Sequence, residues 1–442
     1  MSRGVLWAWM GTFITNLVIV ACGFITGVLT ARFLLPEGRG ALAAVIFWSQ
    51  LTAGIGIMSL PEATTYRIGR WPERASEIIS TAFWLAICLS FIVTTLGYMA
   101  IPSLLGIKRQ ELWNISKLYL LVFIPFNFIG LTLLAIDQGG LRFSIYNRLR
   151  LLGPVIYLLG LVLLWITGHI TVAWIVAMNA SATVIAALIR VFLAGTALLY
   201  RPSFSEAWGL LRDGWSFHLA TLLIIAANQA DIFVILRLWD NKIIGLYMAA
   251  FTVAASALNL VGSTFHTVLF PTLVNTQEKN LRTFKLMEGI RQAMFLLFVI
   301  TVPLMVLAPK LVPLLFGEDF RPASMLSVFL LLAYFLIALK TIVIRSLRGF
   351  GEGLPGATAQ GLSVILFLVI VWPLSARLYV AGVAVALIMA NMASLFYLGF
   401  YLKQNHGVEL RQCWGLTPAT VRQFCKAIRN LFGYYKVGTE VR

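Results

Sequence analysis

Long apolar segments alternate with short polar connections along most of the chain. Each segment contains roughly 20 mostly apolar residues, which is the length that an α-helix needs to cross a hydrocarbon core about 30 Å thick. Charged residues concentrate in the connections between the segments. The pattern predicts twelve membrane-spanning helices, at residues 4–31, 41–60, 78–104, 118–136, 151–167, 170–199, 216–239, 243–274, 290–307, 324–344, 356–373 and 379–402.

Composition supports this interpretation, since 60% of the residues are hydrophobic, 12% are charged and the mean hydropathy is +0.90. Too few polar side chains are present to cover a water-soluble surface. The sequence therefore predicts an all-α polytopic membrane protein. The first apolar segment begins at residue 4 and has no small-residue cleavage site, so we expect it to be retained as a membrane span.

The same local pattern occurs twice in the chain. An arginine is followed eight positions later by a glycine that opens a long apolar segment, first at Arg32 and Gly40, then at Arg237 and Gly245. The copies lie 205 positions apart, and later landmarks keep register with an offset that rises to 213. Such self-similarity predicts a duplicated architecture. Residues 1–200 would form one six-helix bundle, residues 201–402 a second, and residues 403–442 a basic tail.

An even number of crossings per half gives both halves the same orientation, related by an axis along the membrane normal. This arrangement predicts two parallel six-helix bundles around a central cavity. Basic residues number 23 on the side of the N-terminus, tail included, and 10 on the opposite side. Because basic residues favour the cytoplasmic side, we expect both termini in the cytoplasm and the chain in the plasma (cell inner) membrane. The basic and aromatic pattern of residues 421–435 in the tail predicts an amphipathic helix on the membrane surface.

The net charge of +17 is spread over connections next to the membrane, without a folded basic domain. Membrane lipids are therefore the expected partners, and nucleic acid is not. The glycine-rich residues 348–356 join two apolar segments and follow no strand, so we interpret them as a turn and not as a phosphate-binding loop. The four cysteines and His406 match neither a disulfide scaffold nor a common zinc spacing. No catalytic residue, cofactor or metal site is predicted.

Polar residues inside the predicted spans are candidates for function, because a charge at the bilayer centre costs about 2.5 to 3.5 kcal/mol and needs a cavity or a partner. Asp231 lies inside the span 216–239, and Asn228 precedes it by one turn on the same face. We interpret this pair as the candidate site for a coupling cation. Lys340 lies about one turn from the end of the span 324–344, where it can either snorkel to the surface or contact solute.

Two further spans carry polar faces. Asn259 and His266 lie on one face of the span 243–274, together with small residues, and Asn16 lies in the first span. The small residues favour close helix packing, whereas the amide and imidazole groups favour a hydrated lumen. Asn16, Asn259 and His266 are therefore candidates for contact with a transported solute.

Three stretches resemble those of bacterial polysaccharide exporters of the oligosaccharide (O-antigen type) flippase family, within the multidrug/oligosaccharidyl-lipid/polysaccharide exporter superfamily. They are LTARFLLPEGRGALA, DIFVILRL followed by IGLYMAA, and PLLFGEDFRPA. The resemblance spans nearly all of residues 1–402. It implies two bundles of six helices around a central cavity. It also implies a secondary transporter, not an enzyme.

The same resemblance implies a substrate and partners. The substrate would be a polyprenyl-diphosphate-linked oligosaccharide, moved from the cytoplasmic to the outer leaflet by alternating access for surface polysaccharide biosynthesis. The resemblance also suggests exchange against H⁺ or Na⁺, with Asp231 as the coupling carboxylate. A polysaccharide polymerase and its chain-length machinery would be possible partners.

A diphosphate headgroup needs cationic donors along its path. The candidates are the basic residues at the two mouths of the cavity, Arg32 and Arg237 outside and Arg67, Arg142 and Lys340 inside. For any single arginine, ordinary topology signalling is the favoured explanation. Two alternatives stay open at this point: a drug exporter of the same superfamily, and a membrane-embedded glycan polymerase or ligase, which would need a larger outer loop than residues 106–117 provide.

Overall fold

The computed structural model describes residues 3–274 and 278–408, and this part of the chain contains α-helices and short 3₁₀ turns but no strands. The N-terminal half forms α1 (Arg3–Gly56), α2 (Leu60–Arg70), α3 (Ala75–Leu105), α4 (Trp113–Gly139), α5 (Phe143–Thr167) and α6 (Val172–Ala194). The C-terminal half forms α7 (Phe204–Leu238), α8 (Asn241–Val274), α9 (Lys279–Phe316), α10 (Ala323–Gly349), α11 (Leu354–Leu378) and α12 (Ala381–His406). The 3₁₀ turns are η1 (Pro72–Arg74), η2 (Ile107–Leu112), η3 (Gly195–Leu199) and η4 (Glu318–Phe320).

The first two predicted spans are joined directly within α1. Leu35 interrupts this element with a left-handed backbone (φ 58°), and Pro36 follows it without an N–H to continue the helical hydrogen bonds. The second part of α1 then returns toward α2. Within residues 3–274 and 278–408, eleven helical segments are long and apolar enough to cross a membrane, and α1 accounts for two of the twelve predicted crossings. The predicted fold class, an all-α polytopic membrane protein, is confirmed.

The short helix α2 was not predicted, because the sequence placed its arginines in a connecting loop. It begins after Ser59, whose backbone is left-handed (φ 51°), and has Pro61 in its first turn. Leu60, Ala63 and Ile68 are buried on one face of the helix. Eleven residues with this amphipathic pattern are too short to span a bilayer, so a search for long apolar segments misses them.

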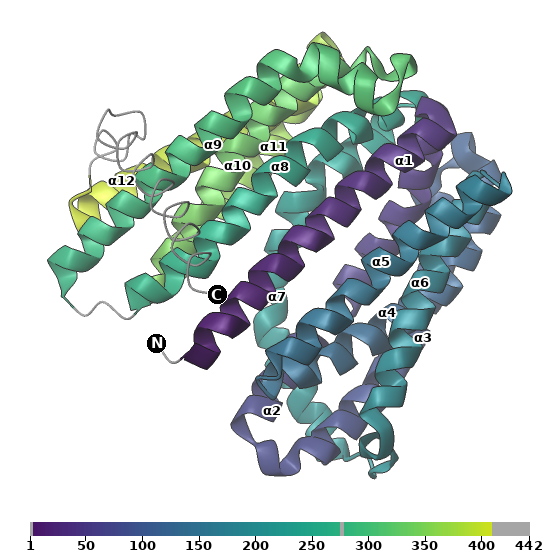
Figure 1. The fold of residues 1–442 in the computed structure, drawn as a ribbon, viewed down its shortest axis with the longest axis vertical. Helices are drawn as coiled ribbons and strands as arrows, with labels where there is room; N and C mark the ends of the chain where they lie inside the picture. The colour runs from purple at the N-terminus through teal and green to yellow at the C-terminus, as the bar shows by residue number, and fades with distance from the viewer. Residues whose placement is uncertain (1–2, 275–277, 409–442) are drawn as a thin grey trace, which may run out of the picture.

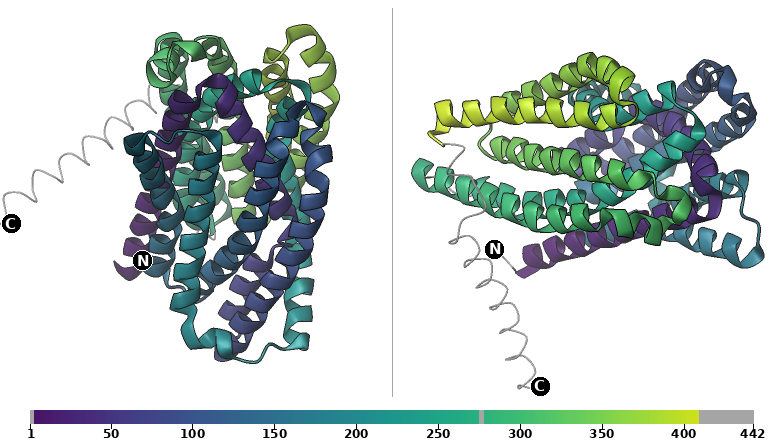
Figure 2. Two further views of the ribbon diagram at one scale, coloured as in Figure 1. Left: turned by 90° about the vertical axis from the view of Figure 1, so that its right-hand side faces the viewer. Right: turned by 90° about the horizontal axis from the view of Figure 1, so that it is seen from above.

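The two halves approach each other at one end of the molecule and diverge toward the other (Figure 1). We call the end with the N-terminus and α2 the inner end, and the end with the bend of α1 and the α7–α8 junction the outer end. The helices run roughly side by side in the perpendicular views, as expected of a membrane bundle (Figure 2). Helix α1 packs most extensively against α8, which belongs to the opposite half.

The glycines of the two sequence repeats contact the opposite half at the outer end. A Cβ atom on Gly40 would lie 1.8 Å from the carbonyl oxygen of Asn241, and one on Gly245 would lie 1.8 Å from that of Pro36. Pro36 and Asn241 are themselves 205 positions apart, the same offset as the glycines. The repeats thus form a reciprocal backbone contact into which only glycine fits, and we call these four residues the outer seal.

The first part of α7 packs against the N-terminal half, although α7 opens the second half of the sequence. Glu206 is almost fully buried and accepts hydrogen bonds from Arg67, with the Nε–Oε1 pair at 2.5 Å. The same guanidinium reaches Asp213 at 2.8 Å, and Arg74 adds a contact of 3.0 Å to Glu206. This ion-pair network fixes the inner end of α7 to α2.

Replacing Glu206 with glutamine is expected to destabilise the protein strongly. The substitution leaves the buried Arg67 guanidinium with an incomplete counter-charge, and breaking a buried ion pair on one side costs about 3 to 5 kcal/mol. Thermal unfolding of the purified protein in detergent measures the effect. Glu77→Gln is the matched control, since Glu77 forms its ion pair with the half-exposed Arg74 and not with the buried Arg67. Equal melting temperatures for the two variants would contradict the structural role of the network.

Candidate substrate and coupling site

A cavity of about 430 Å³ lies between the two halves, on the side of the outer seal that faces the interior. The second part of α1 supplies one wall, and α7, α8, α10 and α12 supply the rest. Its polar lining consists of Arg39, Gln50, Asn228, Gln229, Asp231 and Tyr334. We call it the central cavity. It has the size of a small-molecule site and combines apolar walls with a few polar groups.

Asp231 and Asn228, the predicted cation site, both line the central cavity. Asp231 is 3% exposed, and its Oδ2 accepts a hydrogen bond of 2.6 Å from the hydroxyl of Tyr247. Among the described residues, no basic side chain forms an ion pair with this carboxylate. A buried carboxylate whose hydrogen-bond donors are neutral can take up a proton or a small cation to neutralise its charge.

Arg39 lines the same cavity from α1. Its Nε is buried and has no hydrogen-bond partner in the structure. Among the described residues that line the cavity, it is the one cation. Arg39 lies in a predicted outer connection with other basic residues and was not among the predicted site residues. A guanidinium offers paired donors that match phosphate oxygens, so a free one in a cavity is a candidate anion site.

Arg32 and Arg237, predicted at the outer mouth, bind backbone carbonyls across the outer end. Arg32 donates through Nε to Leu315 at 2.6 Å and through Nη2 to Leu314, at the end of α9. Arg237 donates to Ser103 at 3.3 Å, near the end of α3. Ser103 and Leu314 are repeat equivalents, 211 positions apart. Both arginines therefore reinforce the outer seal by capping a helix C-terminus of the opposite half.

Arg109, from η2, strengthens the same end of the molecule. Its guanidinium donates to the side-chain oxygen of Asn241 at 2.8 Å and to the carbonyls of Leu236 and Trp239 at 2.9 and 2.6 Å. All three acceptors belong to the α7–α8 junction of the other half. Arg109 could not be distinguished by sequence from the neighbouring basic residues of its loop. Its position shows that the outer end is closed by cation-to-carbonyl contacts.

The three basic candidates of the inner side lie apart from the central cavity. Arg67 is held in the α2–α7 ion pairs described above. Arg142 pairs with Asp137 at 2.9 Å. Lys340 is 3% exposed, and its Nζ donates to the hydroxyl of Ser363 on α11 at 2.9 Å.

The three uncharged candidates lie on α1 and α8. Asn16 is half-buried on α1. Asn259 and His266 belong to α8, and their side chains lie outside the described residues. The tail residues 421–435 also lie outside them. Asp231 and Asn228 are thus the predicted site residues that the structure brings together in the central cavity.

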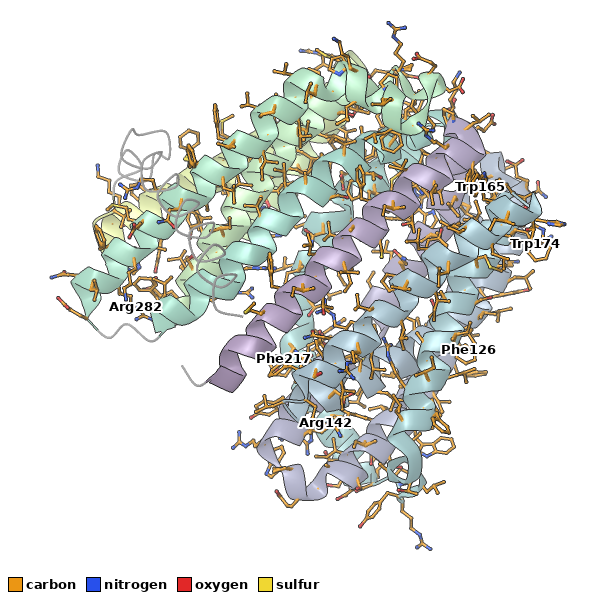
Figure 3. All side chains as sticks on the ribbon, viewed as in Figure 1. Phe126, Arg142, Trp165, Trp174, Phe217 and Arg282 are labelled. Carbon is orange, nitrogen blue, oxygen red and sulfur yellow. The ribbon has the colours of Figure 1, made fainter. Side chains whose placement is uncertain are left out.

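Two exposed tryptophans lie at the outer end of the N-terminal half (Figure 3). Trp165, near the end of α5, and Trp174, near the start of α6, lie close together at the outer end of the N-terminal half (Figure 3). Both are exposed. Tryptophan side chains are enriched where the hydrocarbon core meets the headgroups, so this pair is expected to lie at the outer membrane boundary.

A family model described as polysaccharide biosynthesis protein matches residues 29–325. Among solved structures, the inward closed conformation of the lipid II flippase MurJ is 15% identical, with 90% of this chain and 87% of that chain covered and a TM-score of 0.73. An inward-facing multidrug resistance MATE family transporter of the MOP superfamily is 16% identical, with coverage of 89% and 98% and a TM-score of 0.71. No curated protein matches.

An outward-facing MATE family transporter is 17% identical, covers 90% of this chain and 95% of that chain, and reaches a TM-score of 0.61. At these identities the likeness shows a shared fold. The higher TM-scores with the two inward states agree with the closed outer end and the diverging inner end in Figure 1. The chain therefore has the fold of MOP superfamily transporters, in an arrangement similar to their inward states.

Proposed function

This chain belongs to the polysaccharide biosynthesis protein family, and we propose that it moves a polyprenyl-diphosphate-linked oligosaccharide across the plasma membrane. The direction would be from the cytoplasmic to the outer leaflet, with both termini in the cytoplasm. The two halves, divided near residue 200, would alternate between inward and outward states around the central cavity. The glycan would supply a surface polysaccharide, with a polymerase acting downstream.

The free guanidinium of Arg39 carries the proposal. The diphosphate of the proposed substrate is esterified at both ends and is a dianion, and its transfer through a bilayer needs a cationic group that is not already neutralised by the protein. Arg39 supplies such a group between the halves, because its Nε is buried without a partner. The polar side chains of Gln50, Asn228 and Gln229 add donors and acceptors for sugar hydroxyls.

A multidrug exporter for organic cations is the alternative that Asp231 supports, since a carboxylate attracts such substrates. The neighbouring Arg39 in the same cavity opposes it, because a cationic drug would be repelled there. A polymerase or ligase is less compatible with the outer connections. The described turns η2 and η4 contain only six and three residues, which is little surface to hold reacting glycans.

Reconstitution tests the function directly. Purified protein in phosphatidylcholine vesicles is given a fluorescent polyprenyl diphosphate that bears a short oligosaccharide, and the fraction reached by an external quencher is followed. We expect protein-dependent exchange between leaflets, and no exchange in vesicles without protein. Equal rates in the two samples, together with efflux of a cationic dye, would replace the proposed function by drug export.

Asp231→Asn is expected to uncouple transport from the ion gradient. Asparagine keeps the size of the side chain but cannot gain or lose a proton, and it binds Na⁺ more weakly than a carboxylate does. We expect about tenfold or greater loss of stimulation by a pH or Na⁺ gradient, with leaflet exchange retained at zero gradient. Asp240→Asn is the control, because exposed Asp240 lies outside the central cavity, and asparagine can still accept the hydrogen bond that its side chain accepts from the Ile243 N–H. Undiminished stimulation in Asp231→Asn would exclude the coupling role.

A further inference from the structure

A second cavity, of about 610 Å³, lies at the inner end between α1 and α5. Gly11 and Thr15 of α1 form one wall, and residues 141–145 with Asn147, Arg148 and Leu151 form the other. It shares no lining residue with the central cavity. Arg142 marks its position near the inner ends of both helices in Figure 3. We call this cavity the inner cleft.

Positive charge converges on the inner cleft from two sources. Arg142 and Arg148 both line it and are exposed. Arg148 forms no ion pair with any described residue, and Arg142 uses only Nη2 to reach Asp137. The cleft also contains the first turn of α5, whose N-terminus carries no side-chain cap. The unbonded N–H groups of this turn add the positive end of a helix dipole.

A buried amide points to a ligand in the same place. Asn147 is 6% exposed and lines the cleft. Its Nδ2 donates to the hydroxyl of Thr12 at 2.9 Å, whereas its Oδ1 is buried without a partner. If the amide were turned over, the nitrogen would be left without a partner instead. A buried polar atom of this kind is normally satisfied, so the cleft is built to receive a polar group.

The cleft continues into a lipid-facing surface. Ile145, at its edge, is exposed, and so are Leu159, Leu163 and Ile166 farther along α5. Their spacing of 14, 4 and 3 residues places all four on one face of the helix. A molecule with a phosphate in the cleft could lay an apolar chain along this face without leaving the membrane. A free phosphate in solution would gain nothing from that surface.

We propose that the inner cleft binds the phosphate or diphosphate headgroup of a lipid from the inner leaflet, as a docking site separate from the central cavity. Arg142, Arg148 and the α5 N-terminus would hold the phosphate oxygens, and Asn147 would bond a hydroxyl or a bridging water beside them. The inference rests on the proposed function insofar as the transported lipid carries such a headgroup. A lipid docked here would be presented to the inner opening between the halves.

Native mass spectrometry of the full-length protein, in nanodiscs of phosphatidylcholine, tests the site. All variants carry Arg39→Gln, so that the central cavity does not contribute its cation. We expect polyprenyl diphosphate to bind at least about tenfold more tightly than uncharged polyprenol, and Arg148→Gln to abolish that difference. Arg150→Gln is the matched control: Arg150 lies over the ring of Tyr146, 5.3 Å from its centroid, and does not line the cleft.

Experiments with different phosphate compounds identify which molecule supplies the phosphate. Competition by phosphatidylglycerol equal to that of polyprenyl diphosphate would support the site and assign it to bulk anionic lipid. Binding of inorganic diphosphate as tightly as the lipid would overturn the proposal of a lipid site. Unchanged binding in both Arg148→Gln and the double variant Arg142→Gln/Arg148→Gln would overturn the site itself. Arg148→Gln is the decisive variant. Arg148 forms no ion pair with any described residue, so the substitution should leave folding unaffected.

Failure of this inference and failure of the proposed function give different results. Wild-type protein that binds polyprenyl diphosphate through Arg148 but exchanges no lipid between leaflets would refute only the transport. Wild-type protein that exchanges lipid with no contribution from Arg148 to binding would refute only the docking site.

Discussion

Arg39→Gln is expected to abolish exchange of the diphosphate-linked oligosaccharide while leaving the fold intact. Glutamine preserves hydrogen-bonding capacity but removes the one cation among the described residues of the central cavity. Because Nε of Arg39 has no hydrogen-bond partner in the protein, the substitution breaks no hydrogen bond of that atom. Loss of a charged hydrogen-bonding group from a desolvated site costs about 2 to 5 kcal/mol, which corresponds to at least about thirtyfold in affinity.

Two companion variants separate charge from position. Arg39→Lys keeps the charge but loses the planar pair of donors, so we expect an intermediate rate. Arg321→Gln removes a charge from an exposed outer position and should leave the rate unchanged. Rates are measured by quencher accessibility in vesicles, and thermal unfolding confirms that each variant is folded. Full activity of Arg39→Gln would show that the diphosphate does not contact this cavity.

The sequence predicted the fold because the information needed is local and repeated. Apolar length identified the spans, and the 205-residue offset of Arg32–Gly40 and Arg237–Gly245 reappears as the reciprocal contacts of the outer seal. The prediction failed at α2, where a short amphipathic helix leaves no long apolar signal. It also missed that the first part of α7 packs on the N-terminal half, since the partners Arg67 and Glu206 are 139 positions apart.

The site was predicted less completely, because which charges are free depends on tertiary contacts. Asp231 could be recognised from its place inside a span, whereas the basic residues could not be told apart. The structure shows Arg32, Arg67 and Arg237 engaged with protein acceptors, and Arg39 without one. One signal for Arg39 was available: its repeat equivalent, 205 positions later, is the buried Ile244. A charge that breaks a repeat is a better candidate for function than one that follows it.

Alanine at Gly40 or Gly245 is expected to open the outer seal and stop transport by displacing the conformational equilibrium. Each new Cβ would lie 1.8 Å from a carbonyl oxygen of the other half, so the backbones must separate. Overpacking of this kind costs about 1 to 3 kcal/mol, or about 5- to 150-fold in the population of the closed outer end. If the two costs add, the double variant should lower the population of the closed outer end by up to about 20,000-fold.

Spin labels report the separation directly. Lys108 in η2 and Asp319 in η4 are exposed repeat equivalents on opposite halves at the outer end, and cysteines at these positions carry the labels once the four native cysteines are replaced. Pulsed electron paramagnetic resonance should give a single short distance between the two spin labels in the labelled parent protein without a glycine substitution. The distance should be longer in Gly40→Ala and in Gly245→Ala. Gly23→Ala, in α1 with nothing within 4 Å, should match the parent. Because the contacts are reciprocal, the two seal variants should shift the distance alike; a shift in only one would mean that the halves do not separate about the repeat axis.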